Sequence, residues 1–143
     1  MSYNLLMDIT INTDGGSLHN PGPAACAFVI KHNKKIIREK SFFLGVETNN
    51  VAEYTGVIKA LEEVIEMKKE KKITSVSFIC DSLLLVSQLN GIYKIKNTKI
   101  RELVFKIRTL EQVVGLPISY KHVLREFNQE ADSLVKDCFA THS

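Results

Sequence analysis

Four carboxylates stand at positions from which elements of the chain could direct them into a shared site: Asp14, Glu53, Asp81 and Asp132. Brought together without a counter-ion, they would repel one another and raise each other's pKa values, so such a cluster is stable mainly around hard cations. Oxygen donors without a His or Cys cluster favour Mg²⁺ or Mn²⁺ over zinc. Two such ions, roughly 3.5 to 4 Å apart, activate a water and stabilise the leaving oxygen of a phosphodiester. The four acids therefore predict phosphodiester hydrolysis.

The first half of the sequence must supply the elements that position two of these acids. Apolar and polar residues alternate over residues 7–13, which predicts a strand that the Gly15-Gly16 pair ends, with Asp14 at its terminus. Two more β-rich segments, 24–31 and 36–44, flank a polar hairpin turn. Three strands joined by short links are expected to be antiparallel.

A helix follows these strands, because apolar residues recur at three- and four-residue steps over residues 51–65. The polar residues just before it, Thr48, Asn49 and Asn50, can cap its start. Glu53 would then fall in the first turn, where a carboxylate suits the positive end of the helix dipole.

The second half alternates strands and helices. The segment 73–80 is rich in β-branched and aromatic residues and predicts a strand that ends at Asp81. Further elements are expected in this order: helices at 82–89 and 98–114, a strand at 118–124 and a helix at 128–139. Asp132 lies on the last helix, at the border of its buried face. The order predicts an α/β fold whose mixed sheet has three antiparallel and then two parallel strands, flanked by helices.

Composition limits the kind of protein. A length of 143 residues with 45% hydrophobic residues predicts one globular domain over residues 1–143, and a net charge of +3 is only mildly basic. Three separated cysteines in apolar segments, Cys26, Cys80 and Cys138, are typical of reduced core residues. The N-terminus lacks a targeting signal and no apolar segment is long enough to span a membrane. We expect an intracellular, cytoplasmic protein, with a nuclear location left open.

Each acid also has an ordinary structural explanation. Asp14 suits a turn, Glu53 a capping box, Asp81 an N-cap, and Asp132 the surface of a helix. Any of these explanations is sufficient for one residue. The flanking sequences of the four acids, taken in order, argue for a shared role.

These flanking sequences are TDGG followed by NPGPAA, TNN followed by AEY, CDS, and RE.N..AD. In their order and spacing the chain resembles a type 1 ribonuclease H over nearly its whole length. The resemblance implies a ribonuclease H-like fold with a five-stranded sheet and an endonuclease that cleaves the RNA strand of RNA/DNA hybrids, leaving 3'-hydroxyl and 5'-phosphate ends. It also implies that Asp14, Glu53, Asp81 and Asp132 are catalytic ligands of two metal ions.

The same resemblance extends to residues that would contact the substrate. Asn20, Asn49 and Asn50 match positions that contact the hybrid in its minor groove, where amides can pair with the 2'-hydroxyl of RNA. Thr48 matches a residue that holds a phosphate of the DNA strand. Helix capping and turn formation are the alternative explanation for these four residues.

Two departures from the family point to its compact members. The interval between Asp81 and Asp132 is too short for a basic protrusion, and the basic residues of its segment 94–101 are Lys94, Lys96, Lys99 and Arg101. A weaker and more salt-sensitive affinity for the hybrid is expected. The nearest candidate for a mobile histidine, His122, falls inside the expected last strand and is better explained by packing. A monomer suffices, and no protein partner is indicated.

Other functions fit less well. A proofreading exonuclease would need an acid where Gly16 stands, and an integrase-like enzyme would need Glu at position 132. A calcium loop starting at Thr10 would place Pro21 at its twelfth position, where a bidentate carboxylate is needed. An inactive scaffold of the same fold, which binds nucleic acid or a protein partner, stays open, since a fold alone does not establish activity.

Overall fold

The computed structural model describes residues 5–142, so residues 1–4 and 143 of the expected domain lie outside the described range. The expectation that the N-terminus carries no targeting signal falls partly on those first residues. The described elements are β1 (Leu6–Ser17), β2 (Gly22–His32), β3 (Lys35–Glu47), α1 (Asn49–Met67), β4 (Lys72–Cys80), α2 (Leu83–Leu89), α3 (Thr98–Val114), β5 (Ile118–His122), the 3-10 turn η2 (Arg125–Phe127) and α4 (Gln129–Thr141). The predicted order of strands and helices is confirmed.

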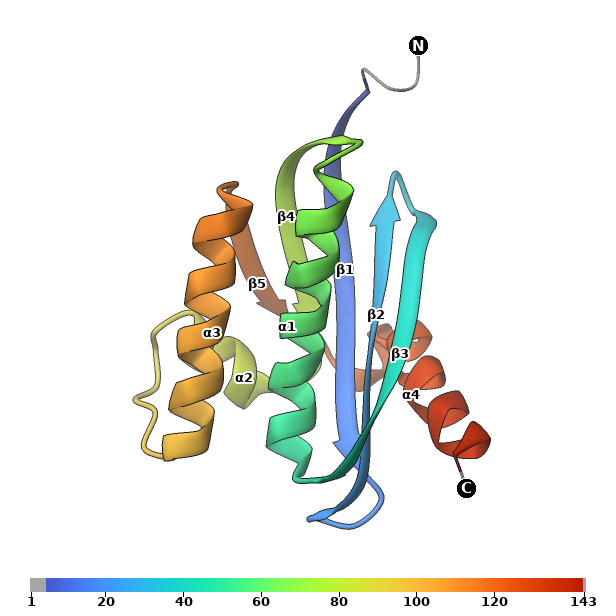
Figure 1. Cartoon of the computed structure of the whole chain (residues 1–143), viewed down its shortest axis with the longest axis vertical. Helices are drawn as coiled ribbons and strands as arrows, with labels where there is room; N and C mark the ends of the chain where they lie inside the picture. Colours follow the sequence, from blue (N-terminus) through green and yellow to red (C-terminus); the bar gives the residue numbers. More distant parts are fainter. Residues whose placement is uncertain (1–4, 143) are drawn as a thin grey trace.

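The strands form one five-stranded sheet in the order β3-β2-β1-β4-β5 (Figure 1). β1 pairs with β2 and β2 with β3 in antiparallel fashion, whereas β4 runs parallel to both β1 and β5. The predicted mixed sheet is therefore confirmed. β1 lies at its centre, so a side chain at the end of β1 has neighbours from both halves of the chain.

Helices cover both faces of the sheet (Figure 1). The larger core lies between the sheet and α1, α2 and α3, and its fully buried side chains include Ile9, Ile11, Phe28, Tyr54, Leu61, Phe78, Leu85 and Ile107. On the other face, Ala25 and Ala27 of β2 pack against Val135 and Cys138 of α4. These small side chains let α4 approach the sheet closely. No described helix has both the length and the apolar character needed to cross a membrane.

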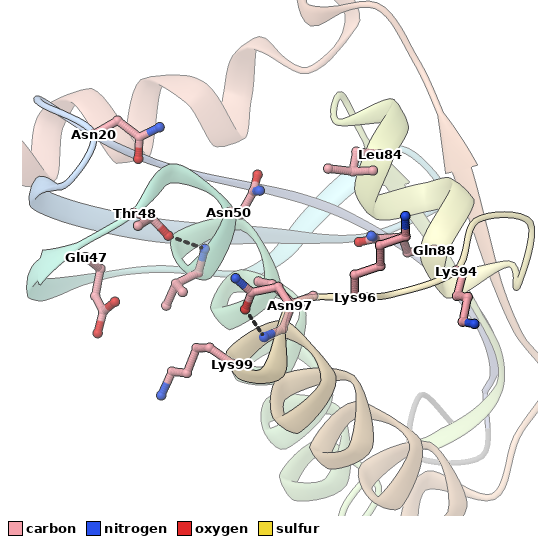
Figure 2. A pocket seen from close by; sticks show the side chains of 12 residues that line it. Asn20, Glu47, Thr48, Asn50, Leu84, Gln88, Lys94, Lys96, Asn97 and Lys99 are labelled. Carbon is pink, nitrogen blue, oxygen red and sulfur yellow. Dashed lines mark hydrogen bonds between the residues drawn. The ribbon is translucent and has the colours of Figure 1, made fainter.

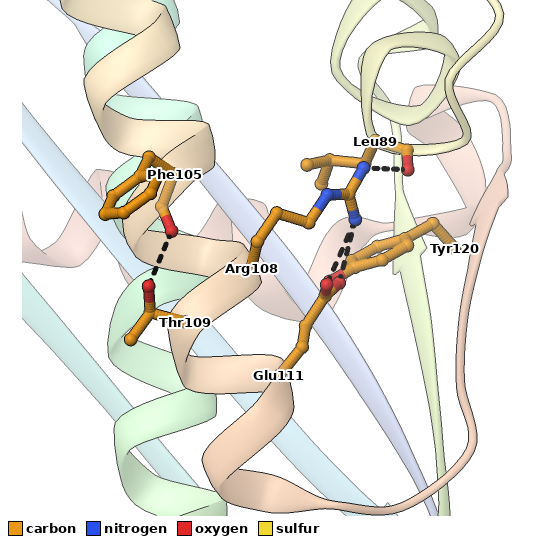
Figure 3. Close-up of polar contacts among 6 residues, drawn as sticks. All are labelled: Leu89, Phe105, Arg108, Thr109, Glu111 and Tyr120. Atoms are coloured by element: carbon orange, nitrogen blue, oxygen red, sulfur yellow. Dashed lines mark hydrogen bonds and ion pairs between the residues drawn. The ribbon is translucent and has the colours of Figure 1, made fainter.

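A polar network ties α3 to its neighbours (Figure 3). The Arg108 guanidinium donates to both carboxylate oxygens of Glu111 at 3.1 Å and to the Leu89 carbonyl at the end of α2. The hydroxyl of the buried Tyr120 on β5 donates to Glu111 at 2.6 Å. The network satisfies polar groups next to the core, which otherwise would be costly to bury.

The prediction that the Gly15-Gly16 pair ends the first strand is wrong. β1 continues to Ser17, and its two glycines pair across the ladder with Cys26 and Ala25 of β2. Glycine weakens a strand but keeps both backbone hydrogen-bonding groups, so pairing with a long neighbour can carry the strand through it. Asp14 consequently lies inside β1 rather than at its end.

The start of α1 is confirmed at the predicted polar cluster. Thr48 is the N-cap, and its hydroxyl accepts from the Val51 backbone N–H at 3.2 Å. Since the helix begins at Asn49, Glu53 lies one residue beyond the first turn, and the prediction that placed it there is wrong. The cap of α2 is Ser82, so Asp81 itself is not a capping residue.

The last strand is shorter than predicted. It ends at His122, and Val123 makes one more backbone hydrogen bond to Cys80 before the chain turns through η2. The expected helix at 128–139 is α4, which begins one residue later and ends at Thr141. His122 lies within β5, as the alternation predicts.

Candidate active site

Two of the four predicted acids come from adjacent parallel strands. Thr13 of β1 and Cys80 of β4 are register partners, so the residues that follow them, Asp14 and Asp81, lie side by side. Glu53 reaches the same point from α1. One carboxylate oxygen from each of Asp14, Glu53 and Asp81 lies within 4.8 Å of the others.

Gly15 explains how α1 comes so close to β1. A Cβ built on this residue would lie 2.4 Å from the backbone carbon and oxygen of Ala52 and 2.7 Å from the backbone nitrogen of Glu53. Only glycine allows this contact between two backbones. It brings Glu53 close to Asp14, the residue that precedes Gly15 in β1.

Asp132 lies beside this triad on α4 and is not one of its three members. It lines a cavity of about 430 Å³ together with Asp14 and Glu53, and its Oδ2 lies 2.9 Å from the Lys136 ammonium. After burial and the charge of Asp81, the charge of Asp132 also helps to raise the pKa of Asp14. The structure thus brings three predicted acids together and places the fourth on the wall of their cavity.

Burial and mutual repulsion change the protonation of the triad. The pKa of Asp14 rises to about 7, mainly through burial and then through the charge of Asp81. The pKa of Glu53 rises to about 8, again through burial first and then through Asp14 and Asp81. Carboxylates that repel at this distance resist ionisation unless a cation compensates them.

The donor set fits hard divalent cations. The triad offers carboxylate oxygens, and the described residues place no His or Cys among its members. Mg²⁺ and Mn²⁺ prefer such oxygen ligands, whereas zinc and softer metals prefer nitrogen or sulfur. Asp14, Glu53 and Asp81 are therefore the side chains that could hold a cation, with Asp132 available from the cavity wall.

Three neighbours of the triad were not recognised as site residues from the sequence. Asn128 is fully buried, and its amide nitrogen donates to the Thr13 carbonyl at 2.9 Å and to Asp81 Oδ2 at 3.4 Å. Burial dominates the raised pKa of Glu53, and against it a side-chain hydrogen bond with Ser82 and the charge of Arg125 lower that pKa. Asn and Ser look like helix caps in a sequence, so only the tertiary structure reveals these contacts.

In the absence of divalent cations, we expect the free energy of unfolding to fall as the pH rises from about 4 to about 8. Unfolded Asp and Glu titrate near pH 4, whereas folded Asp14 and Glu53 titrate near 7 and 8. Between these values the folded state binds more protons than the unfolded state, so its stability is lost as the pH rises. Urea unfolding in EDTA at several pH values measures this loss.

The variant Asp14→Asn isolates the contribution of the carboxylates from other titrating groups. In EDTA at pH 8 it should be more stable than the wild type by roughly 1 to 3 kcal/mol, and the gap should close below about pH 4, where the unfolded carboxylate is protonated as well. Added Mg²⁺ should stabilise the wild type at pH 8 more than the variant. Equal stability of the variant and the wild type at pH 8 in EDTA would contradict the expected repulsion among the carboxylates.

The four predicted substrate-binding residues lie around the start of α1. Asn20, Thr48 and Asn50 line a second cavity of about 650 Å³ (Figure 2). Asn49 lines the carboxylate cavity instead. Its Oδ1 accepts from the Ser17 backbone N–H at 2.7 Å, and its own backbone N–H donates to Asn20 Oδ1 at 3.0 Å. The start of α1 therefore separates two cavities and contributes side chains to both.

The second cavity is positively charged on one side. Lys94, Lys96 and Lys99 line it from the segment between α2 and α3 and from the first turn of α3, while Glu47 is its one carboxylate (Figure 2). Residues 90–97 join the two helices without a helical protrusion. Three of the four basic residues expected here thus line one cavity, whereas the Arg101 guanidinium donates to the Lys96 carbonyl at 3.1 Å.

Comparisons with known proteins agree with this geometry. A family model described as reverse transcriptase-like matches residues 12–138. Bifunctional protein Rv2228c of Mycobacterium tuberculosis is 33% identical over 133 residues, which cover 92% of this chain and 35% of the relative. Ribonuclease HI of Halobacterium salinarum is 32% identical over 126 residues, which cover 87% of this chain and 60% of the relative. The chain therefore spans only part of these relatives.

Solved structures match more completely. LC11-RNase H1 in complex with an RNA/DNA hybrid is 36% identical with a TM-score of 0.86, covering 91% of this chain and 95% of that one. RNase H1 from Halobacterium salinarum is 30% identical with a TM-score of 0.85, covering 94% and 98%. The chain belongs to the reverse transcriptase-like family and, within it, to the type 1 ribonucleases H.

Proposed function

We propose that this chain is an endoribonuclease that hydrolyses the RNA strand of RNA/DNA hybrids. The observation that carries the proposal is the triad of Asp14, Glu53 and Asp81, whose oxygens lie within 4.8 Å of one another, just beyond the last paired residues of β1 and β4. The solved relative LC11-RNase H1 is in complex with an RNA/DNA hybrid, which supports the choice of substrate. All four predicted carboxylates belong to one copy of the chain, so we propose a monomer.

The triad and Asp132 would hold two Mg²⁺ or Mn²⁺ ions. Such ions supply an activated water and stabilise the leaving oxygen, which yields 3'-hydroxyl and 5'-phosphate ends. The protein contributes the positions of its side chains: the parallel register aligns Asp14 with Asp81, and the Gly15 contact brings in Glu53. The raised pKa values of Asp14 and Glu53 mean that cation binding displaces protons near neutral pH.

The start of α1 would lie between the two strands of the hybrid. The RNA strand would meet the carboxylates, and Asn49 would supply an amide donor to a 2'-hydroxyl, because its oxygen is already used by Ser17. The DNA strand would enter the second cavity. There, Thr48 uses its oxygen to cap α1 and keeps its hydroxyl hydrogen to donate to a phosphate. Capping and substrate binding are thus compatible for this residue.

Free cysteines give a further indication of where the enzyme would act. Cys26, Cys80 and Cys138 are all buried and unpaired with one another in the described chain. Such residues are typical of proteins in a reducing compartment. We propose an intracellular, cytoplasmic enzyme.

A cleavage assay tests the proposal. Labelled RNA/DNA hybrid, single-stranded RNA and double-stranded RNA are each incubated with the protein in Mg²⁺, in Mn²⁺ and in EDTA. Cleavage of the RNA strand of the hybrid alone, dependent on a cation, is the expected result, and phosphatase treatment of the products identifies the 5'-phosphate. A folded protein that binds the hybrid and cleaves it in neither metal would favour the inactive scaffold instead.

We expect the double substitution of Lys96 and Lys99 by methionine to weaken substrate binding without slowing the chemical step. The two ammonium groups line the second cavity, where a phosphate backbone would release its counterions on binding them. The slope of log KM against log salt should fall by about 1 for each phosphate that a lysine no longer neutralises, with kcat nearly unchanged. Steady-state kinetics at several salt concentrations measure the slope.

Lys69→Met is the matched control for this prediction. Lys69 lies beyond the opposite end of α1, exposed and paired with Glu66, so its replacement should leave the salt slope unchanged. An equal slope in the cavity variant and in this control would show that the two cavity lysines do not contact the hybrid.

A further inference from the structure

Gln88 lies between the hydrophobic core and the second cavity. It is the penultimate residue of α2 and one of the residues that line the cavity (Figure 2). Its Oε1 accepts a hydrogen bond from the hydroxyl of Tyr54, which belongs to α1 and is only 1% exposed. A fully buried tyrosine thus holds the end of a side chain that borders the cavity.

This hydrogen bond determines which polar group of the Gln88 amide, the carbonyl or the NH2 group, is available to a ligand. A glutamine side chain carries one carbonyl acceptor and two N–H donors, and a phenol holds its proton at neutral pH. Because the Tyr54 hydroxyl donates to the carbonyl, the NH2 group of Gln88 is left as the polar group for a ligand. Without the hydroxyl, the amide could turn by half a rotation and offer its oxygen instead.

Two other polar side chains at the cavity, Asn97 and Thr48, also have their oxygens occupied. The Oδ1 of Asn97 accepts from the Ile100 backbone N–H at 3.0 Å, and Thr48 Oγ1 is likewise occupied as a cap (Figure 2). Three lysine ammonium groups add positive charge, against the single carboxylate of Glu47. A wall of N–H and O–H donors with excess positive charge suits the oxygens of a phosphodiester backbone.

We propose that Tyr54 is a positioning residue that fixes the Gln88 amide so that its NH2 group donates to a backbone oxygen of the hybrid strand in the second cavity. This inference rests on the proposed function, since it assigns a contact for the same substrate. Gln88 would be the binding residue, and Tyr54 would act only through it. Gln88 stands apart from the expected substrate residues Asn20, Thr48, Asn49 and Asn50.

Two substitutions test the Tyr54 hydroxyl and the Gln88 amide separately. Tyr54→Phe removes the hydroxyl and keeps the ring in the core, whereas Gln88→Met keeps the length of the side chain and removes its donors. Each should raise KM about threefold to tenfold, the range expected when one hydrogen bond is removed, and leave kcat within about twofold. Tyr54→Phe made in the Gln88→Met background should raise KM no further, because the group that it orients is gone.

The experiment measures kcat and KM for hybrid cleavage in Mg²⁺ with the wild type, the two single variants and the double variant. Binding of a fluorescent hybrid is measured in parallel, with Asp81→Asn added to every protein so that cleavage does not interfere. Tyr120→Phe is the matched control: it also removes a buried hydroxyl bonded to a side chain, but its partner Glu111 belongs to the α3 network outside the cavity (Figure 3). It should lower stability and leave KM unchanged.

The outcomes separate this inference from the proposed function. Coupled increases in KM and in the dissociation constant, absent from Tyr120→Phe, support it. Independent, additive effects of the two substitutions would overturn it, because Tyr54 would then act by another route, such as its neighbour Glu53. Unchanged KM in both single variants, with normal wild-type cleavage, would overturn the inference and leave the function standing. A wild type that neither binds nor cleaves the hybrid would overturn both.

Discussion

Replacing Asp81 with asparagine is expected to abolish cleavage of the hybrid and to leave the fold intact. The substitution keeps the size of the side chain and removes a negative charge from the point where the three carboxylates meet. The proposed cation site would then have one ligand fewer, and the remaining acids would hold a cation less well. We expect turnover to fall by about 10³-fold or more, which corresponds to roughly 4 kcal/mol of transition-state stabilisation.

The fold should tolerate this change because Asp81 makes few structural contacts. The Asn128 amide donates to Asp81 Oδ2 at 3.4 Å, and the carbonyl oxygen of an asparagine could accept the same hydrogen bond. Its charge raises the pKa values of Asp14 and Glu53, so its removal should relieve repulsion. In EDTA near pH 8 the variant should be at least as stable as the wild type.

Single-turnover cleavage in Mg²⁺ and urea unfolding in EDTA measure these two effects. Asp137→Asn is the matched control, since Asp137 is an exposed acid on the same helix as Asp132 and lies outside the cavity lining. It should cleave at the wild-type rate. Turnover at the wild-type rate by Asp81→Asn would contradict the assignment of Asp81 as a metal ligand. An inactive variant that is also unfolded would leave the assignment without support.

The approach of Asp14 to Asp81 follows from features that a sequence displays. Alternation over residues 7–13 and a β-rich segment at 73–80 predict two strands, and a connecting helix predicts that they run parallel. Acids next to the carboxyl ends of parallel strands then lie at the same edge of the sheet. The observed pairing of Thr13 with Cys80 has this arrangement.

Other parts of the site depend on tertiary contacts that leave no local signal. Thr48, Asn49 and Asn50 are all good capping residues, so the sequence alone does not show which of them begins α1. The structure uses Thr48 as the cap and bonds Asn49 to Ser17, which moves Glu53 beyond the first turn. Asn128 likewise precedes a helix, yet its side chain bonds β1 and Asp81 rather than its own helix.

Gly15 carries the second large expected effect, because Gly15→Ala should both destabilise the protein and disable the site. The new methyl group would lie 2.4 Å from the backbone of Ala52, a distance at which one element must move away from the other. The atoms in this contact are backbone atoms, which cannot rotate away as the end of a flexible side chain could. Overpacking of this kind costs about 1 to 3 kcal/mol or more.

The same displacement would separate Glu53 from Asp14, since Glu53 directly follows Ala52 on α1. Misplacement of a catalytic group by about 1 Å can cost roughly 10²-fold in rate. We therefore expect Gly15→Ala to reduce turnover by about 10²-fold at a temperature where circular dichroism shows that it is still folded. Raising the concentration of Mg²⁺ should restore part of the activity if the weakened triad binds the cation less tightly.

Gly16→Ala is the matched control for stability. Its Cβ would lie 3.6 Å from Asn49 Oδ1, an ordinary van der Waals distance, so the free energy of unfolding should change by less than about 1 kcal/mol. The two glycines are adjacent in β1 and both pair with β2, so β-propensity affects them alike. Equal stability of the two variants would contradict the view that a contact between backbones holds Glu53 in place, and Glu53 would then need another anchor, such as its hydrogen bond with Ser82.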